Sequence, residues 1–167
     1  CKIDLSGKAE ILNKVEIVTM CDIDNPMYGP TGASHIFGPQ KGADEAMVLE
    51  LDEGIKNLSR AITEAIGKDI SDVPGTGAAG AMGAGMIAFF GSRLQMGIQT
   101  VLDTVKFDEM ISDADYIITG EGKLDSQSLR GKVVIGIAER AKKQNKNVIA
   151  VVGGADDSEI DKAYEMG

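Results

Sequence analysis

The feature that most constrains the fold is an alternation of two short apolar runs with an amphipathic segment near the end of the chain. Residues 115–119 form the first apolar run, which breaks at Gly120, and residues 147–152 form the second. Between them, residues 133–141 place apolar side chains at helical spacing. Short apolar runs bounded by glycine are typical of buried strands. Strand, helix and strand in this order predict a βαβ unit with two parallel strands, and hence an α/β fold.

The loop after the first predicted strand is the strongest candidate for a functional site. Open α/β sheets bind ligands outside the carboxyl ends of their strands, where this loop must lie. A carboxylate can accept the proton of an attacking hydroxyl, and glycine amides with lysines can hold phosphate. The loop suits phosphoryl transfer to an alcohol, with a capped surface loop as the open alternative. Its candidate residues are two glycines and four charged side chains: Gly120, Gly122, Glu121, Lys123, Asp125 and Lys132.

The charge and the cysteine count exclude several classes of protein. The formal net charge of -9 argues against nucleic acid and an anionic membrane as partners, because both need a basic face. One histidine and two cysteines, Cys1 and Cys21, give neither a disulfide framework nor the usual ligands of zinc. We therefore expect a reducing compartment, the cytoplasm. The sequence also contains no apolar run long enough to predict a membrane span.

A second candidate site lies in the first third of the chain. Residues 15–20 alternate as a strand does, and Asp22, Asp24 and Asn25 follow directly. Oxygen side chains at a strand end suit a hard cation such as Mg²⁺, although the same residue types also cap turns. Both interpretations stay open on the residues alone. A further turn-rich loop contributes Lys41 as a candidate contact for an anion.

Residues 44–66 give the clearest helical pattern. Asp44 suits the N-cap, Gly67 suits the position after the last helical residue, and apolar side chains recur every three or four residues. We interpret the charged residues of this helix as a solvated face without a functional role.

A glycine-rich segment, residues 75–90, follows a polar break. Gly75, Gly77 and Gly80 match the dinucleotide-binding fingerprint, which needs a strand immediately before it. No strand pattern precedes these glycines. A nicotinamide-dependent oxidoreductase is therefore an alternative that this loop only weakly favours.

We interpret the same segment instead as a helix that another backbone approaches closely. Small residues recur at a spacing of four, at Gly77, Ala81 and Gly85. The glycine-rich start of the helix, with Gly75 and Thr76, offers backbone amides and the positive end of the helix dipole to an anion.

Four motifs, in this order, resemble the bacterial glycerate kinase family. They cover most of the chain between residues 21 and 153 and are far more specific than a single glycine pattern. Neither a P-loop nor the motif set of protein kinases is present. The motifs are CDIDNPMYGPTGA (residues 21–33), FGPQKGA (37–43), PGTGAAG (74–80) and TGEGKLDSQ (119–127), the last followed by GK (131–132).

The resemblance implies an enzyme that phosphorylates D-glycerate with Mg²⁺-ATP. Asp125 is then the carboxylate nearest the glycerate hydroxyl, and Lys132 and Lys123 neutralise the substrate carboxylate or the transferred phosphate. Glu121 or Asp22 holds Mg²⁺. Further contacts to substrate or phosphate are implied for small and polar residues of the motifs: Gly75, Thr76, Gly77, Gly120, Gly122, Asn25 and Lys41.

The resemblance also implies two α/β domains with the active site in the cleft between them. Residues 1–105 are expected to form most of a smaller inserted domain, and residues 106–167 part of a Rossmann-like domain. Family members are longer at both ends, so we expect the remainder of the polypeptide to complete the enzyme and this stretch alone to be inactive. A non-catalytic ligand-binding fragment is the second alternative.

Overall fold

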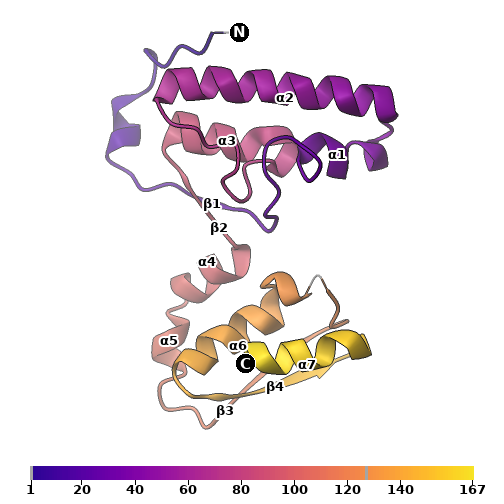
Figure 1. The fold of residues 1–167 in the computed structure, drawn as a ribbon. Helices are drawn as coiled ribbons and strands as arrows, with labels where there is room; N and C mark the ends of the chain where they lie inside the picture. Colours follow the sequence, from indigo (N-terminus) through magenta and orange to yellow (C-terminus); the bar gives the residue numbers. More distant parts are fainter. Residues whose placement is uncertain (1, 127) are drawn as a thin grey trace. The chain divides into compact units, whose positions relative to one another are not determined.

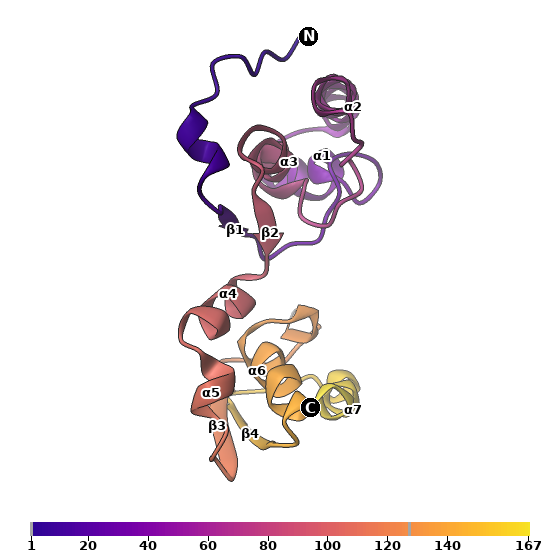
Figure 2. The same ribbon diagram turned by 90° about the vertical axis from the view of Figure 1, so that its left-hand side faces the viewer.

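The protein divides into two compact units, Cys1–Gln95 and Met96–Gly167. The computed structural model describes residues 2–126 and 128–167, so Cys1 and Gln127, the last residue of the fourth motif, lie outside the described residues. We expected the division near residue 105. The ten residues before that point belong to the second unit because their helix packs on the helix that connects the two later strands. Figures 1 and 2 show the elements of each unit.

The first unit is mainly helical and holds one short pair of strands. Its strands pair in parallel, with Thr19 of β1 opposite Leu94 of β2. Its elements are η1 (Glu10–Asn13), β1 (Val18–Met20), α1 (Ala33–Phe37), η2 (Pro39–Lys41), α2 (Glu45–Ile66), α3 (Ala78–Phe90) and β2 (Arg93–Gln95).

Helix α2 confirms the clearest sequence pattern. The side chain of Asp44 accepts a hydrogen bond from the amide of Met47, and Gly67 adopts the left-handed conformation that ends a helix. Figures 1 and 2 show α2 and α3 side by side. The core between them holds fully or almost fully buried side chains, among them Met27, Ile62, Ile70 and Ala84.

Close backbone approach on α3 occurs at two glycines. A Cβ atom on Gly77 would lie 2.1 Å from the carbonyl oxygen of Pro26, and one on Gly83 would lie 2.2 Å from that of Gly75. The expected close approach of another stretch of backbone therefore occurs at Gly77. The same expectation is wrong for Gly85, where a Cβ atom would meet only the Phe89 side chain, at 3.6 Å.

The second unit contains the expected βαβ arrangement. Strands β3 and β4 pair in parallel over six residues, with Ile118 opposite Ile149. Ile117 and Val148 on one face pack with side chains of α6, and Figure 1 shows α6 and α7 on that side of the strands. Its elements are α4 (Gly97–Thr104), α5 (Phe107–Met110), β3 (Tyr116–Glu121), η3 (Ser128–Arg130), α6 (Val133–Lys143), β4 (Asn147–Val152) and α7 (Asp157–Met166).

The other face of the β3–β4 pair is apolar and exposed. Ile118 is 73% exposed and Val151 is 65% exposed. Parallel strands are normally covered on both faces, so this face is incomplete as a sheet surface. None of the helices in the described part of the chain is long and apolar enough to cross a membrane.

Candidate functional site

The loops that follow β3 and β4 lie side by side, as the sequence predicted. The amide of Leu124 donates to the carbonyl of Gly154 at 2.9 Å, and the amide of Asp156 donates back to the carbonyl of Leu124 at 2.9 Å. A Cβ atom on Gly120 would lie 2.5 Å from the carbonyl oxygen of Val151, so this glycine lets the strands approach. These bonds fix the loop after β3 at the carboxyl end of the strand pair.

Lys123 is already engaged within this loop. Its Nζ lies 2.7 Å from Oδ1 of Asp156, in an ion pair whose two side chains are about half exposed. Hydrogen bonding to Asp156 and its charge raise the pKa of Lys123 above its ordinary value. No sequence signal indicates Asp156, because it belongs to the loop after the other strand.

Asp125 and Ser128 cap each other. The amide of Ser128 donates to Oδ1 of Asp125 at 3.2 Å, and the amide of Asp125 donates to Oγ of Ser128 at 3.2 Å. Lys132 follows at the N-cap of α6, where its carbonyl accepts the amide of Gly136 at 2.7 Å. The structure therefore brings Lys123, Asp125 and Lys132 onto one short segment between β3 and α6.

Glu121 ends β3 with an unsatisfied acceptor. Its Oε1 is buried and has no hydrogen-bond partner in the described part of the chain. A buried carboxylate oxygen without a partner is costly, and such an atom calls for a ligand, a cation or a water. Gly122 next to it is exposed and has open space where a side chain would stand. Glu121 is therefore suited to bind a group that enters from outside the loop.

A pocket of about 310 Å³ brings together predicted residues of the first unit. Asp22 follows β1, Lys41 ends η2, and both line this pocket together with the start of α3, Ala78, Ala79 and Gly80. A carboxylate, a lysine and exposed backbone thus face one small volume. This combination suits a small anion or a phosphate with its counter-ion.

The glycine loop before α3 was expected to hold phosphate, but the structure buries it within the chain. Gly75, Thr76 and Gly77 are buried. The hydroxyl of Thr76 donates to Val73 at 2.7 Å and its amide donates to the same carbonyl at 3.1 Å. The amide of Gly77 donates to the carbonyl of Asn25 at 3.0 Å. The groups of Thr76 and Gly77 that were expected to hold phosphate are therefore committed within the chain, and the exposed backbone begins at Ala79.

Asn25 holds its own loop together. Its Nδ2 donates to the carbonyl of Thr31 at 2.8 Å while its carbonyl accepts Gly77. The turn-capping interpretation of this residue therefore describes its contacts in the structure. Directly after it, the amide of Gly29 donates to both carboxylate oxygens of Asp52, which lies in α2. The interpretation of every charge on α2 as solvated is wrong for Asp52.

The pocket wall at the start of α3 is strained. Ala79, Gly80 and Ala81 all have left-handed backbone conformations, with φ of 51°, 69° and 72°. This conformation costs a non-glycine residue roughly 1–2 kcal/mol. Such strain persists where the surroundings impose it, and it concentrates at functional sites. The turn lines the pocket that also holds Asp22 and Lys41.

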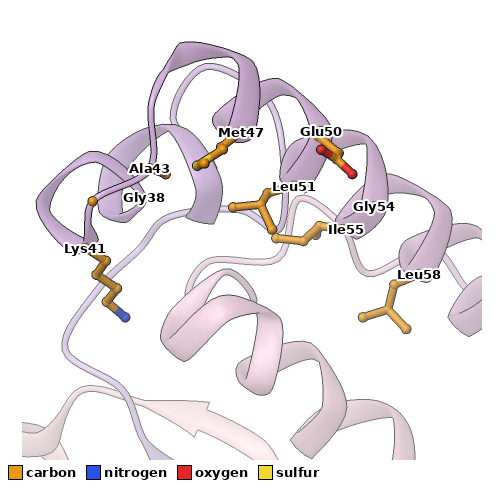
Figure 3. Close-up of a pocket in the computed structure, with 10 residues that line it drawn as sticks. Gly38, Lys41, Ala43, Met47, Glu50, Leu51, Gly54, Ile55 and Leu58 are labelled. Carbon is orange, nitrogen blue, oxygen red and sulfur yellow. The ribbon is translucent and has the colours of Figure 1, made fainter.

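A larger groove on the first unit has a different character. It measures about 750 Å³ and runs along α2. Figure 3 shows Met47, Leu51 and Leu58 extending from α2 over this groove, with Lys41 on the neighbouring turn. Its lining is mainly apolar, with Lys41 and Glu50 as the charged residues among the lining residues. It carries no set of groups suited to phosphate chemistry.

Within the residues that the structure describes, metal binding by protein ligands alone is not indicated. Among residues 2–126 and 128–167, no group of three or more histidine, cysteine, aspartate or glutamate side chains is arranged to hold a metal ion. Magnesium in nucleotide-dependent enzymes needs fewer ligands, since one or two carboxylates share it with phosphate oxygens. Glu121, with its unsatisfied buried oxygen, fits such a role.

Comparison with known protein families decides the family. The whole chain, residues 1–167, matches the glycerate kinase family. The protein belongs to this family. Among curated relatives, glycerate 2-kinase of Escherichia coli (strain K12) is 48% identical over 155 residues, which are 93% of this chain and 41% of that protein. A glycerate kinase of Bacillus cereus (strain ATCC 10987 / NRS 248) is 46% identical over 165 residues, which are 99% of this chain and 43% of that protein.

A solved structure supports the fold of this chain. The crystal structure of a protein from Salmonella typhimurium LT2, assigned as glycerate kinase 2, superposes with a TM-score of 0.79 at 37% identity. The superposition covers 99% of this chain and 48% of that one. The chain thus spans less than half the length of the relatives it matches, and its α/β fold class is confirmed.

Proposed function

We propose that the complete gene product transfers the γ-phosphoryl group of ATP to a hydroxyl of D-glycerate, in a cleft between two domains. The observation that carries the proposal is the loop after β3, where a carboxylate and two lysines follow the strand within a chain that matches the glycerate kinase family throughout. The names of the relatives agree with this substrate. On this proposal, residues 1–105 would form most of the inserted domain and residues 106–167 part of the Rossmann-like domain. The compact units of this chain divide ten residues earlier, after Gln95.

Asp125 is the proposed base for the glycerate hydroxyl. A carboxylate is suited to accept that proton as the hydroxyl attacks the phosphorus atom. The Ser128 amide holds one of its oxygens, which fixes the direction of the side chain. In phosphoryl transfer, positioning of this kind supplies much of the rate enhancement.

Three lysines are the proposed partners of negative charge. Lys132, at the start of α6, and Lys123 neutralise the carboxylate of glycerate or the transferred phosphoryl group. Lys41, in the pocket of the first unit, contributes a third cation there. Such local cations are needed because the protein carries a net charge of -9 that repels both anionic substrates.

Mg²⁺ is proposed to bind with ATP through Glu121 or Asp22. The ion would neutralise charge on the β- and γ-phosphates. The unsatisfied oxygen of Glu121 and the place of Asp22 in its pocket favour these two carboxylates. The backbone at the exposed residues Gly80 and Gly122 is the proposed phosphate contact, in place of the amides of Thr76 and Gly77 that the chain uses itself.

The chain of 167 residues by itself is proposed to lack this activity, because it spans 41–43% of the length of the two curated relatives described above. A nicotinamide-dependent oxidoreductase is a weak alternative, since turns and no strand precede Gly75 in the structure. A fluorescence titration with NADH tests it directly.

The test of the proposal is ADP release by the complete gene product with Mg²⁺-ATP and D-glycerate. Release that depends on glycerate and exceeds the ATP-only background is the expected result. Absence of glycerate-dependent release would contradict the proposal. A glycerate-dependent rise in the melting temperature without turnover would favour the non-catalytic binding alternative.

A further inference from the structure

The hydroxyl and the amide of Ser128 both form hydrogen bonds within the loop after β3. Ser128 is 2% exposed. Its Oγ accepts the amide of Asp125 at 3.2 Å and donates to the carbonyl of Lys123 at 3.2 Å. Its own amide donates to Oδ1 of Asp125 at 3.2 Å. One buried residue thus contacts both the main chain and the side chain of Asp125, together with the main chain of Lys123.

We infer that Ser128 is the positioning residue for Asp125 in the phosphoryl-transfer reaction. The inference rests on the proposed function, because it takes Asp125 as the base. Ser128 itself does not contact the reacting atoms. It acts by holding the Asp125 carboxylate in one direction and by fixing the backbone from which that carboxylate extends.

The physical reason is the sensitivity of proton and phosphoryl transfer to geometry. Without Oγ of Ser128, the amide of Asp125 and the carbonyl of Lys123 both lose a partner in a partly buried place. The backbone then shifts to find other partners, and the carboxylate moves with it. A misplacement of about 1 Å can cost as much as 100-fold in rate.

A purely structural role would give a different result. The Asp125–Ser128 pair resembles a turn cap, and loss of a cap lowers the stability of the fold. Such a loss lowers the melting temperature but leaves kcat unchanged in the folded enzyme. A positioning role lowers kcat under conditions where the enzyme is fully folded.

The experiment compares three variants of the complete gene product. Ser128→Ala removes the hydroxyl and Ser128→Thr keeps it. Ser112→Ala is the matched control, because it removes the hydroxyl of an exposed serine outside this loop that also donates to a backbone carbonyl. Steady-state kinetics give kcat and the KM values for D-glycerate and Mg²⁺-ATP. Amide hydrogen exchange gives the protection of the Asp125 amide, which does not depend on activity.

The expected result for Ser128→Ala is a fall in kcat of at least about tenfold, with both KM values within about twofold of wild type. Ser128→Thr recovers most of kcat, and Ser112→Ala keeps the wild-type kcat. Exchange at the Asp125 amide becomes faster in Ser128→Ala, while the amides of β3 and α6 keep their protection.

Two results would overturn the inference. One is a Ser128→Ala enzyme with kcat within twofold of wild type, and the other is unchanged exchange at the Asp125 amide. Failure of the proposed function is recognised separately, because wild type itself would then release no glycerate-dependent ADP. In that case exchange still decides whether Ser128 fixes Asp125.

Discussion

The carboxylate of Asp52 in α2 accepts the backbone amide of Gly29 at 3.0 Å to one oxygen and 3.2 Å to the other. The contact joins the longest helix of the first unit to the turn that follows Asn25. Nε2 of His35 lies 3.9 Å from the same carboxylate. The Asp52 side chain therefore anchors the first motif, residues 21–33. Asp22, near the start of that motif, lines the pocket of the first unit.

We predict that Asp52→Ala lowers the free energy of unfolding by about 1–3 kcal/mol, because it leaves the partly buried amide of Gly29 without an acceptor. Glu53→Ala removes an exposed neighbouring carboxylate and is expected to change stability by less than about 0.5 kcal/mol. Urea unfolding followed by circular dichroism measures both. Equal effects of the two substitutions would show that the Asp52 contact does not stabilise the loop.

The pairing of Lys123 with Asp156 predicts a specific pH dependence. The raised pKa of Lys123 means that this side chain holds its proton more tightly in the folded protein than in the unfolded chain. The stabilisation is therefore complete below the ordinary lysine pKa of 10.5 and is lost as the pH rises through the raised value. Its size is small, because both side chains are largely solvated.

An NMR titration of the Lys123 side chain tests this pairing. We expect Asp156→Asn to lower the pKa of Lys123 toward its ordinary value, and Asp157→Asn to leave it unchanged. A titration midpoint that is the same in wild type and Asp156→Asn would contradict the ion pair.

The strained turn at the start of α3 predicts a stabilising substitution. Ala79→Gly relieves roughly 1–2 kcal/mol of left-handed strain and costs roughly 0.5–1 kcal/mol of backbone entropy. The net effect is a gain of up to about 1.5 kcal/mol. Ala65→Gly, at an exposed ordinary position of α2, should instead lose up to about 1 kcal/mol. A destabilising Ala79→Gly in urea unfolding would show that the left-handed conformation carries no strain.

We expect replacement of Arg140 on α6 by lysine to cost more stability than the same replacement at an exposed arginine. The guanidinium of Arg140 donates to both carboxylate oxygens of Asp108 at 3.0 and 2.6 Å, and to Asp103 at 2.7 Å. Lysine cannot reproduce this fork, so Arg140→Lys should cost about 1–2 kcal/mol of stability. Arg60→Lys, at an exposed position of α2, should cost less than about 0.5 kcal/mol. Equal urea midpoints for the two variants would contradict the prediction.

The sequence predicted the regular elements well where the period was clear. The pattern of residues 44–66 gave α2 with its two caps, and the two apolar runs gave β3 and β4 with the loops beside each other. Strand β2 was missed because three residues, Arg93–Gln95, are too few to show a period. Helix α1 was missed because it is one turn long and lies between proline-containing loops.

The site was predicted less completely, for reasons of geometry. Residue types indicated Lys123 and Asp125, but their partners Asp156 and Ser128 became evident only when the loops were placed. The sequence predicts an anion site at residues 75–77, because sequence cannot tell a free backbone amide from one that the chain itself uses. In this loop, Asn25 accepts one of those amides.

The most direct test of the account is the rate of phosphoryl transfer by Asp125→Asn in the complete gene product. We predict a fall in kcat of about 100-fold or more, because a general base typically contributes that factor, with the fold intact by circular dichroism. Asp157→Asn, outside the proposed site, should keep the wild-type rate. A fall of less than about tenfold in a folded Asp125→Asn enzyme would remove Asp125 from the role of base and contradict the account.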